Sequence, residues 1–539
     1  MKKDCFSLLN LWVALLFCLL LVREGNAQTL PSFTAKAEFV PREFLVRLKP
    51  QTGQETAQGL LSTGGAKVTP LSLRRGWYLV QYPHTQAMRV GFQTLTAHLR
   101  VTYIEPNYVY RASITPNDPQ FLPDQWNLRK IRAESAWSLS SLSDRVVAIV
   151  DSGIDYNHED LKSNLFVNPA EVAGNGIDDD GNGVVDDIHG ANFFVKNGNP
   201  LDDNGHGTHV SGIVGAVGNN GLGVSGVCWG VPLLAVKFLN ANGAGSLSGA
   251  VGALNYVADM KQAYQDNNGT KGANITVVNA SWGSGADSQA LKDAIQRLSD
   301  LGILFVAAAG NSGSNNDVTP VYPSSYALPN VLAVAATTAK DALATFSNFG
   351  QQEVDLAAPG VGVLSTYLGN TYATLNGTSM AAPHVTGAVA LLAGYHPEFT
   401  MAQIRDRILQ SVDKTSRLTG KVQTGGRLNL LRALDPTAKP QLISQISTDK
   451  PKYRFGEMAL LSVFVRADYD LVKNTYVDLA VTTPNGTIIT QQHSTESKGQ
   501  TTFQFSVLAS YGIGKYKVAI KAHRSGYILS RTKTSFTAK

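Results

Sequence analysis

The hydrophobic positions of the chain follow three different patterns along its length. In the middle, five short runs are apolar at every position, which is typical of strands buried on both faces of a parallel sheet. These runs are residues 146–150, 233–236, 275–278, 303–306 and 331–334. Stretches with helical spacing, 248–264 and 288–301, lie between them. The alternation predicts an α/β fold with a doubly wound, mostly parallel sheet, whose functional residues lie at the carboxyl ends of strands.

The two flanking regions have strand patterns of another kind. Before the middle region, residues 43–48 and 77–82 alternate apolar and polar positions, 90–99 have helical spacing, and 101–107 close the segment as a strand. Residues 28–113 are therefore predicted to form a small α/β unit of ferredoxin-like type. After residue 435, the stretches 460–465, 477–482, 501–507 and 516–521 alternate between turn signals. This pattern predicts an antiparallel β-sandwich over 436–539 and leaves 114–435 as the central domain.

The N-terminus has the pattern of an export signal. Lys2 and Lys3 precede a mostly apolar stretch, 6–22, and Gly25-Asn26-Ala27 supplies small residues for cleavage. The alternative is an uncleaved anchor, but the apolar stretch is shorter than the roughly 20 residues that span a bilayer. We therefore expect residues 1–27 to be removed and the protein to be secreted, either outside the cell or into a periplasm, without a stable membrane anchor.

The positions of the cysteines predict a mature chain without an internal disulfide. Cys5 and Cys18 leave with the signal, so Cys228 remains without an internal disulfide partner.

The charge is distributed unevenly along the chain. Residues 28–113 carry 10 basic and 4 acidic side chains, residues 114–435 carry 19 and 29, and residues 436–539 carry 14 and 6. The net positive charge of residues 28–113, called the leader below, is complementary to the net negative charge of the central domain. Since no basic stripe with interleaved aromatic residues is present in that domain, we expect no nucleic-acid partner, and we expect a monomer.

Three motifs in the central domain carry candidate chemistry. They are VVAIVDSGID with Asp151, NGHGTHVSGIVGA with His206 and His209, and NGTSMAAPHVTGAVALL with Ser379. Each has an ordinary alternative, because an Asp after a strand or a Ser before a helix is often a helix cap, and two histidines can bind metal. Together they supply a nucleophile, a base and a carboxylate that orients the base. The order Asp, His, Ser excludes the α/β-hydrolase arrangement.

These motifs, in this order, resemble the signatures of the subtilase family of serine proteases over roughly residues 116–432. The resemblance implies that Ser379 is the nucleophile, His206 the general base, Asp151 the orienting carboxylate and His209 a structural residue. A further stretch, VAAAGNSG, resembles the family's oxyanion-hole motif and assigns that role to Asn311. Without the other three motifs, Asn311 would be an ordinary turn residue.

The resemblance also implies a peptide-binding cleft. Two segments match the family's edges that pair with an extended substrate, and a third lines the opposite wall of the primary pocket. These segments are Gly243-Ala244-Gly245, Ser281-Trp282-Gly283 and Ala308-Ala309-Gly310. Val321 falls at the predicted floor of that pocket, where its bulk favours small or medium apolar side chains of a protein or peptide substrate.

Calcium is the expected cofactor. The stretch AGNGIDDDGNGVVDDIHG places Asp178, Asp180, Asn182, Asp186 and Asp187 close together in sequence, and hard oxygen ligands suit Ca²⁺. It is not an EF-hand, because His189 stands where that loop needs a glutamate. The alternative is a solvated acidic loop. By resemblance, a second site combines Asp118, Asn192 and Asn220, with Asn192 in place of a carboxylate. A third is expected at Asp202 and Asp203.

The flanking regions resemble parts of bacterial secreted proteases. Residues 28–113 resemble a subtilase propeptide, which would act as a folding template and inhibitor and be cut near residues 111–115. The C-terminal sandwich resembles an accessory domain, and no residue of it is assigned a role. Two alternatives remain from sequence. One is a scaffold that retains the fold without turnover, and the other is a binding protein whose proteolysis serves its own maturation alone.

Overall fold

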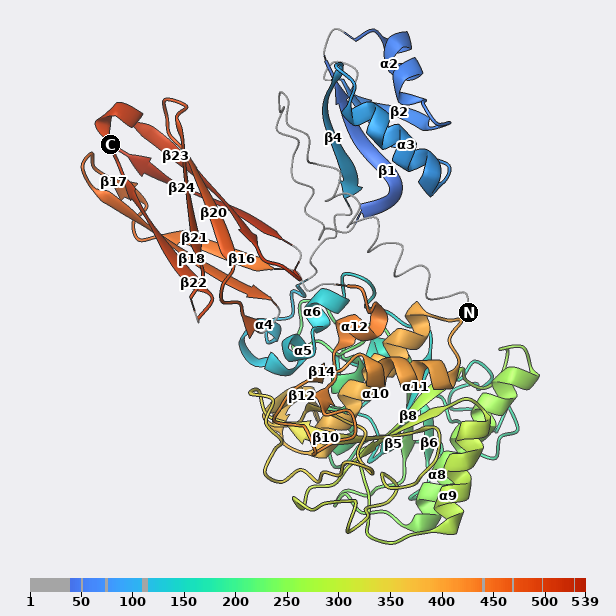
Figure 1. The fold of residues 1–539 in the computed structure, drawn as a ribbon. Coiled ribbons are helices and arrows are strands. Elements are labelled where there is room, and N and C mark those ends of the chain that lie inside the picture. The colour runs from blue at the N-terminus through green and yellow to red at the C-terminus, as the bar shows by residue number, and fades with distance from the viewer. Residues whose placement is uncertain are drawn as a thin grey trace. The chain divides into compact units, whose positions relative to one another are not determined.

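The computed structural model describes residues 39–49, 52–72, 76–108, 115–438, 442–467, 470–496, 498–527 and 529–539. The predicted signal sequence lies outside these residues, as does the predicted cleavage region except for Thr115. The chain divides into two compact units, residues 1–112 and 113–539 (Figure 1).

The first unit is a four-stranded antiparallel sheet with two helices. Its strand order, β2-β3-β1-β4, is that of the predicted ferredoxin-like fold. The sequence patterns missed α2 and β2. Only Ala57 and Leu61 of α2 are buried, and β2 is an edge strand that contains Pro70, so neither has a regular apolar pattern. In chain order the elements are β1 (Phe39–Leu48), α2 (Gln54–Leu61), β2 (Lys67–Ser72), β3 (Trp77–Gln81), α3 (Thr85–Thr96) and β4 (Val101–Tyr108).

The second unit begins with the predicted doubly wound domain. Its nine-stranded sheet has the order β14-β15-β11-β10-β9-β8-β5-β7-β6 and is parallel except at the β14–β15 pair. A separate hairpin, β12–β13, lies outside it. The strands are β5 (Val146–Asp151), β6 (Gly190–Asn192), β7 (Leu233–Lys237), β8 (Ile275–Ala280), β9 (Leu304–Ala308), β10 (Val331–Thr337), β11 (Leu356–Pro359), β12 (Val363–Tyr367), β13 (Thr371–Leu375), β14 (Asp413–Lys414) and β15 (Gly426–Arg427).

Helices cover both faces of this sheet (Figure 1). Val147 and Ile149 of β5 belong to a core with α7, α10, α11 and α12, whereas Ala148 and Val150 belong to a core with α8 and α9. This two-sided burial explains why the strands are apolar at every position. The helices are α4 (Phe121–Asp124), α5 (Trp126–Lys130), α6 (Ala133–Ala136), α7 (His206–Gly215), α8 (Leu247–Asp266), α9 (Gln289–Asp300), α10 (Thr378–Tyr395), α11 (Met401–Gln410) and α12 (Leu430–Leu434).

The C-terminal part consists of two β-sheets with one shared apolar core, as the alternating pattern predicted. One sheet joins β16, β18, β19 and β22, and the other has the order β17-β24-β23-β20-β21. All pairs are antiparallel except the two-residue pair of β17 with β24. The strands are β16 (Ile443–Thr448), β17 (Lys452–Tyr453), β18 (Met458–Ala467), β19 (Asp470–Leu471), β20 (Tyr476–Thr482), β21 (Ile488–Ser494), β22 (Gln500–Ser506), β23 (Gly514–His523) and β24 (Ser530–Ala538). No helix within the described ranges is long and apolar enough to cross a membrane.

Candidate active site

The predicted catalytic residues lie where the winding of the sheet reverses direction. From β5 the chain continues to β6 and β7 on one side and then returns to β8 on the other. Asp151 ends β5, and Ser281 follows the neighbouring strand β8. His206 opens α7 and Ser379 is the second residue of α10, and these two helices pack together. Such a reversal point forms a crevice at the carboxyl ends of the strands.

Asp151 and His206 form a hydrogen-bonded pair. Oδ1 of Asp151 accepts from His206 Nδ1 at 2.8 Å and from the Ser152 amide at 2.7 Å. Asp151 is fully buried, while the His206 side chain is 26% exposed. Burial disfavours the imidazolium, but the charge of Asp151 and its hydrogen bond outweigh this effect, with a contribution from Asp202, and the pKa of His206 is raised. A neutral ring bound in this way carries its proton on Nδ1 and leaves Nε2 as the base.

Ser379 is hydrogen-bonded to Ser281 in both directions. Its hydroxyl donates to the Ser281 carbonyl at 3.1 Å, and the Ser281 hydroxyl donates to the Ser379 carbonyl at 2.8 Å. Pro383, four residues further along α10, has no N–H for that carbonyl, so the Ser281 hydroxyl replaces a helical bond. No hydrogen bond joins Ser379 to His206 in the described part of the chain. In this structure the proton of the Ser379 hydroxyl is directed to the Ser281 carbonyl.

Asn311 and the Ser379 amide border one small space. Oδ1 of Asn311 accepts from the amide and the hydroxyl of Thr378, both at 2.9 Å, which fixes the side chain and leaves its Nδ2 group as a donor. A Cβ built on Gly377 would lie 3.5 Å from the Ser379 amide nitrogen and 3.6 Å from Asn311 Nδ2. Glycine at 377 thus leaves room beside two N–H donors, as an oxyanion hole requires.

The sequence analysis missed Asn348, which fixes the loop that carries Asn311. This side chain is 1% exposed. Its Oδ1 accepts from the backbone amides of Ser312 at 2.9 Å and Ser314 at 3.1 Å, and the backbone amide of Asn348 donates to the Gly310 carbonyl at 2.9 Å. No local sequence signal marks Asn348, because its role depends on contacts more than 30 residues away along the chain.

The segment Ser281-Trp282-Gly283 extends β8 towards the predicted pocket. Just beyond it, Ser284 and Tyr322 exchange two backbone hydrogen bonds of 2.8 Å. A Cβ built on Gly283 would lie 3.3 Å from Cγ1 of Val321. The structure therefore brings Val321 beside this segment, as the predicted pocket floor requires.

The other two predicted substrate segments also follow strands. Residues 243–245 lie in an exposed loop after β7, where Ala244 bonds through its amide and carbonyl to Asn240. For the backbone N–H and C=O of Gly245, no partner is present among the residues that the structure describes. Ala308 ends β9, and Ala308 and Ala309 are buried directly before the loop that carries Asn311.

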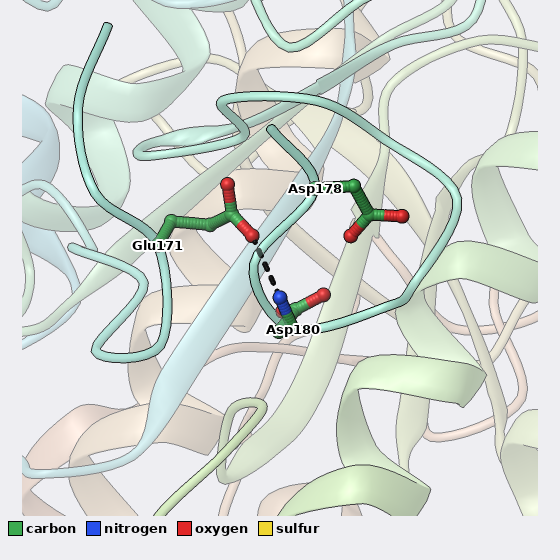
Figure 2. A group of neighbouring side chains, drawn as sticks. All are labelled: Glu171, Asp178 and Asp180. Atoms are coloured by element: carbon green, nitrogen blue, oxygen red, sulfur yellow. Dashed lines mark hydrogen bonds between the residues drawn. The ribbon is translucent and has the colours of Figure 1, made fainter. Parts of the chain in front are cut away.

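The acidic stretch of residues 173–190, called the acidic insert below, is where the first calcium site was predicted. The carboxylates that come together there are not the predicted set. Carboxylate oxygens of Glu171, Asp178 and Asp180 lie within 4.8 Å of one another (Figure 2). Glu171, which the sequence analysis missed, accepts through Oε1 from the amides of Asp179 at 2.8 Å and Asp180 at 3.0 Å. Its Oε2 is buried and has no hydrogen-bond partner among the described residues. A carboxylate oxygen in that position suits a cation.

The remaining predicted ligands of the insert have other partners. Both oxygens of Asp186 accept from backbone amides, at Gly174 and Gly176. The Asn182 side chain donates to Asp180 at 3.1 Å and to Asp187 at 2.8 Å. Burial raises the pKa of Asp187 to about 6. Asp186 therefore shapes the loop around the group of three carboxylates, and Asn182 joins Asp180 of that group to Asp187.

The second predicted cluster contains Asp118 and Asn220 but not Asn192. Asp118 accepts from the backbone amide of Asn220 at 3.0 Å, and the side-chain amide of Asn220 donates to Asp160 at 2.7 Å. Burial raises the pKa of Asp160, and the charge of Asp118 adds to this effect. Asn192 instead bonds within its own loop, to Phe194 and its neighbours. Asp160 is thus the carboxylate that the sequence analysis sought at Asn192.

The third expected calcium site is not formed. Asp202 accepts five hydrogen bonds from protein groups, including the amides of Gly205 and Thr208 at the start of α7. Asp203 forms an ion pair with Lys237 at 2.7 Å. Both carboxylates are therefore used by the protein itself.

Comparisons with known proteins identify the family of the central domain. Residues 143–433 match the subtilase family, Peptidase_S8. A thermophilic serine proteinase of Bacillus sp. (strain AK1) is 34% identical over 402 residues, which cover 74% of this chain and 88% of that protein. Thermitase of Thermoactinomyces vulgaris is 35% identical over 320 residues, 59% of this chain and 99% of that protein. A solved structure, a cold adapted subtilisin-like serine proteinase, is 28% identical, covers 53% of this chain and 88% of its own, and has a TM-score of 0.42.

Proposed function

Since the chain belongs to the subtilase family and is a serine-type endopeptidase, we propose that it cleaves proteins with Asp151, His206 and Ser379 as its catalytic triad. The observation that carries this assignment is the 2.8 Å hydrogen bond between the buried Asp151 carboxylate and His206 Nδ1. It leaves Nε2 as a base beside the helix that carries Ser379.

The proposed reaction follows from these roles. Ser379 rotates away from the Ser281 carbonyl and transfers its proton to His206 Nε2 as Oγ attacks the peptide carbonyl. Asn311 Nδ2 and the Ser379 amide donate to the oxyanion. His206 then gives its proton to the departing amine, and an acyl-enzyme remains on Ser379. Water, activated by His206, releases the acyl group in the second half of the reaction.

Substrate binding is proposed along the segments 243–245 and 281–283. The unpaired backbone groups of Gly245 would add an extended peptide to that edge through main-chain hydrogen bonds, which tolerate many side chains. Val321, close to Gly283, would restrict the primary pocket to small or medium apolar side chains. A library cleavage profile dominated by arginine or lysine would contradict this assignment.

Each segment of the chain is assigned a role in export, inhibition, catalysis or as an accessory domain. Residues 1–27 are proposed to direct secretion, and residues 28–113 to inhibit the enzyme until autocatalytic removal. Residues 114–435 form the catalytic domain and residues 436–539 an accessory β-sandwich. The opposite net charges of the leader and the catalytic domain support the inhibitory role.

Calcium is proposed to bind at two acidic clusters. Glu171, Asp178 and Asp180 would hold one ion, and the partnerless Glu171 Oε2 supports that site. Asp118 and Asp160, beside Asn220, are proposed for a second. Burial and the charge of Asp118 raise the pKa of Asp160, and neither carboxylate has a basic partner among the described residues, whereas Asp203 is paired with Lys237. Bound Ca²⁺ would neutralise the clustered carboxylates and stabilise a chain that has no disulfide among the residues assigned to the mature enzyme.

The experiment that tests the proposed function compares the full chain with its Ser379→Ala variant in calcium. Propeptide removal and casein hydrolysis are followed together. The wild type is expected to process itself and digest casein, and the variant to do neither. If both chains behave alike, the assignment of Ser379 as nucleophile is wrong.

A further inference from the structure

Lys237 is a buried lysine beside the catalytic aspartate that the proposed mechanism does not use. It ends β7, and in the parallel pairing of β7 with β5 it stands opposite Asp151. Its side chain is 3% exposed. A buried ammonium group is costly unless each of its donors has a partner, so its position requires an explanation.

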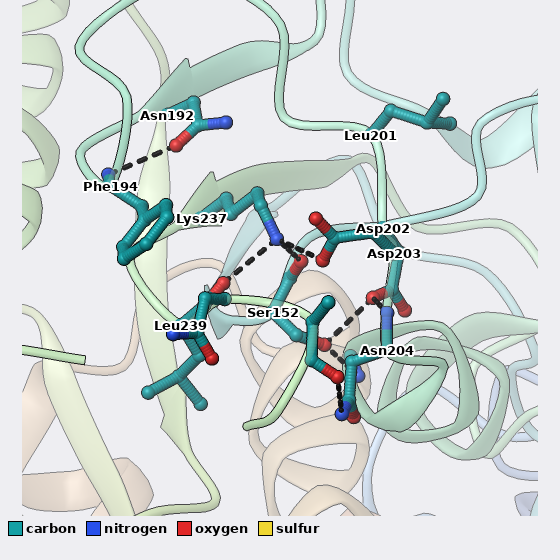
Figure 3. Close-up of polar contacts among 12 residues, drawn as sticks. Ser152, Asn192, Phe194, Leu201, Asp202, Asp203, Asn204, Lys237 and Leu239 are labelled. Atoms are coloured by element: carbon teal, nitrogen blue, oxygen red, sulfur yellow. Dashed lines mark hydrogen bonds and ion pairs between the residues drawn. The ribbon is translucent and has the colours of Figure 1, made fainter. Parts of the chain in front are cut away.

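All three donors of this ammonium group have oxygen partners (Figure 3). Nζ donates to the Ser152 carbonyl at 2.6 Å, to Asp203 Oδ1 at 2.7 Å and to the Leu239 carbonyl at 2.8 Å. Each acceptor belongs to a different functional segment. Ser152 follows Asp151, Asp203 lies three residues before His206, and Leu239 begins the stretch that leads to the substrate segment 243–245. One side chain therefore connects three parts of the site.

Ser152 transmits this contact to the catalytic pair. Its amide donates to the same Asp151 oxygen that accepts from His206. Its hydroxyl donates to Asp202 at 2.8 Å and accepts from the Gly207 amide at 2.9 Å. The orientation of Ser152 is thus fixed at its carbonyl by Lys237 and at its hydroxyl by the start of α7. Any rotation of Ser152 would move a donor away from the Asp151 carboxylate.

We propose that Lys237 is a positioning residue, whose ammonium group aligns Asp151, the loop before His206 and the substrate segment through Ser152, Asp203 and Leu239. This inference rests on the proposed triad. Lysine fits the role because its ammonium group supplies three donors from one point, whereas the planar guanidinium of arginine directs its donors differently.

The charges around His206 give this role a measurable signature. The charges that act on the His206 ring are those of Asp151 and Asp202, and His209 is a further titratable group coupled to it. Lys237 and Asp203 form an ion pair at the loop before His206, and Tyr367 donates to the Asn204 carbonyl of that loop. Loss of the Lys237 charge leaves Asp203 uncompensated, which favours the imidazolium. Loss of the Asp203 charge leaves Lys237 uncompensated, which disfavours it. The acid limb of the pH profile should therefore move in opposite directions in the two variants.

The test compares Lys237→Met and Asp203→Asn in the full chain with calcium, normalised to active sites titrated with an acylating reagent. Lys237→Met should lower kcat about 10- to 100-fold per active site and move the acid limb of kcat/KM to higher pH by about half a unit. Asp203→Asn should move the limb to lower pH by a similar amount, with a smaller loss in kcat. Lys237→Arg should restore the position of the limb without restoring kcat fully.

Lys261→Met is the matched control, because Lys261 is a partly buried lysine of α8 that bonds Asn274 away from the site. It should leave kcat and the pH profile unchanged. The proposal is overturned if both Lys237→Met and Asp203→Asn keep wild-type kcat and an unmoved acid limb per active site. If Lys237→Met does not mature, Asp203→Asn alone decides, since the Asp203 side chain is 54% exposed and asparagine keeps an oxygen acceptor for Lys237. Failure of the triad assignment would instead appear as full activity of Ser379→Ala.

Discussion

Ser281 and Ser379 exchange two hydrogen bonds, hydroxyl to carbonyl in each direction. The pairing joins the end of β8 to the first turn of α10 and occupies the Ser379 hydroxyl in the free enzyme. Since Pro383 cannot bond the Ser379 carbonyl, the Ser281 hydroxyl is the donor that fixes the turn carrying the proposed nucleophile.

Ser281→Ala is therefore expected to reduce catalysis, while the Ser281 carbonyl that accepts from the Ser379 hydroxyl stays in place. It removes the donor to the Ser379 carbonyl, and an unpaired acceptor there costs on the order of 1–3 kcal/mol. We expect kcat per titrated active site to fall about 10-fold. Ser299→Ala, in α9, is the control and should have no effect. An unchanged kcat in Ser281→Ala would show that this hydroxyl does not position the nucleophile.

Asn311→Ala should lower kcat about 10²–10³-fold with little change in KM, which is the loss known for an oxyanion donor in this family. The variant Thr378→Val separates this effect from loop fixation, because it removes one of the bonds that hold Asn311 and leaves the Nδ2 donor in place. Thr378→Val should lose far less activity. Equal losses in the two variants would contradict the assignment of Nδ2 as a donor to the oxyanion.

The pH dependence of kcat/KM should report the raised pKa of His206. Catalysis needs the neutral ring, so activity is lost as the pH falls through this pKa. Because Asp151 stabilises the imidazolium, half-maximal kcat/KM is expected above pH 6.5, the usual value for histidine. A profile measured with a peptide substrate on titrated enzyme tests this directly. A midpoint at or below pH 6.5 would contradict the electrostatic account of the pair.

Two buried histidines should make the catalytic domain sensitive to acid. Burial lowers the pKa of His209 and of His384 to about 4, whereas unfolded histidine protonates near pH 6.5. The unfolded chain therefore binds more protons below pH 6.5, and stability is lost between pH 6.5 and 4, by about 3 kcal/mol per histidine. Urea unfolding of the Ser379→Ala protein, which avoids self-digestion, measures this loss.

The matched variant His384→Gln removes one of the two titrating groups. It should lose about half as much stability between pH 7 and 4.5 as the parent protein. An identical pH dependence in both proteins would mean that His384 does not contribute.

Calcium removal should lower the thermal stability of the Ser379→Ala protein. The acidic clusters repel internally without a cation, so chelation is expected to reduce Tm by several degrees, and added Ca²⁺ to restore it. Glu171→Gln should weaken the response to calcium, because its unpaired oxygen lies beside Asp178 and Asp180. Asp406→Asn, at an exposed position of α11 on the other face of the sheet, is the control and should respond as the parent does. No change in Tm on chelation would contradict calcium binding.

The sequence predicted the elements with regular apolar patterns and the order of the catalytic motifs. Val146–Asp151 and its neighbouring strands are apolar throughout because helices cover both faces of the sheet. Edge elements such as Lys67–Ser72 escaped detection because exposure removes that pattern. Composition likewise identified the acidic insert.

Residues that act over long sequence separations escaped detection. Asn348 fixes the Asn311 loop, Glu171 completes an acidic cluster and Asp160 joins Asp118 and Asn220, and none of these stands in a motif that the analysis recognised. Asn192 was misplaced in the second cluster because its sequence neighbours do not reveal which strand edge it faces. Only the folded backbone supplies that information.

The most direct test of the central claim is covalent labelling of the mature enzyme with a fluorophosphonate, followed by peptide mass spectrometry. One adduct is expected, on Ser379. It should be lost in the His206→Ala variant, from which the leader is removed by an added protease, because the Ser379 hydroxyl then has no base. An adduct on another serine, or unreduced labelling without His206, would contradict the triad.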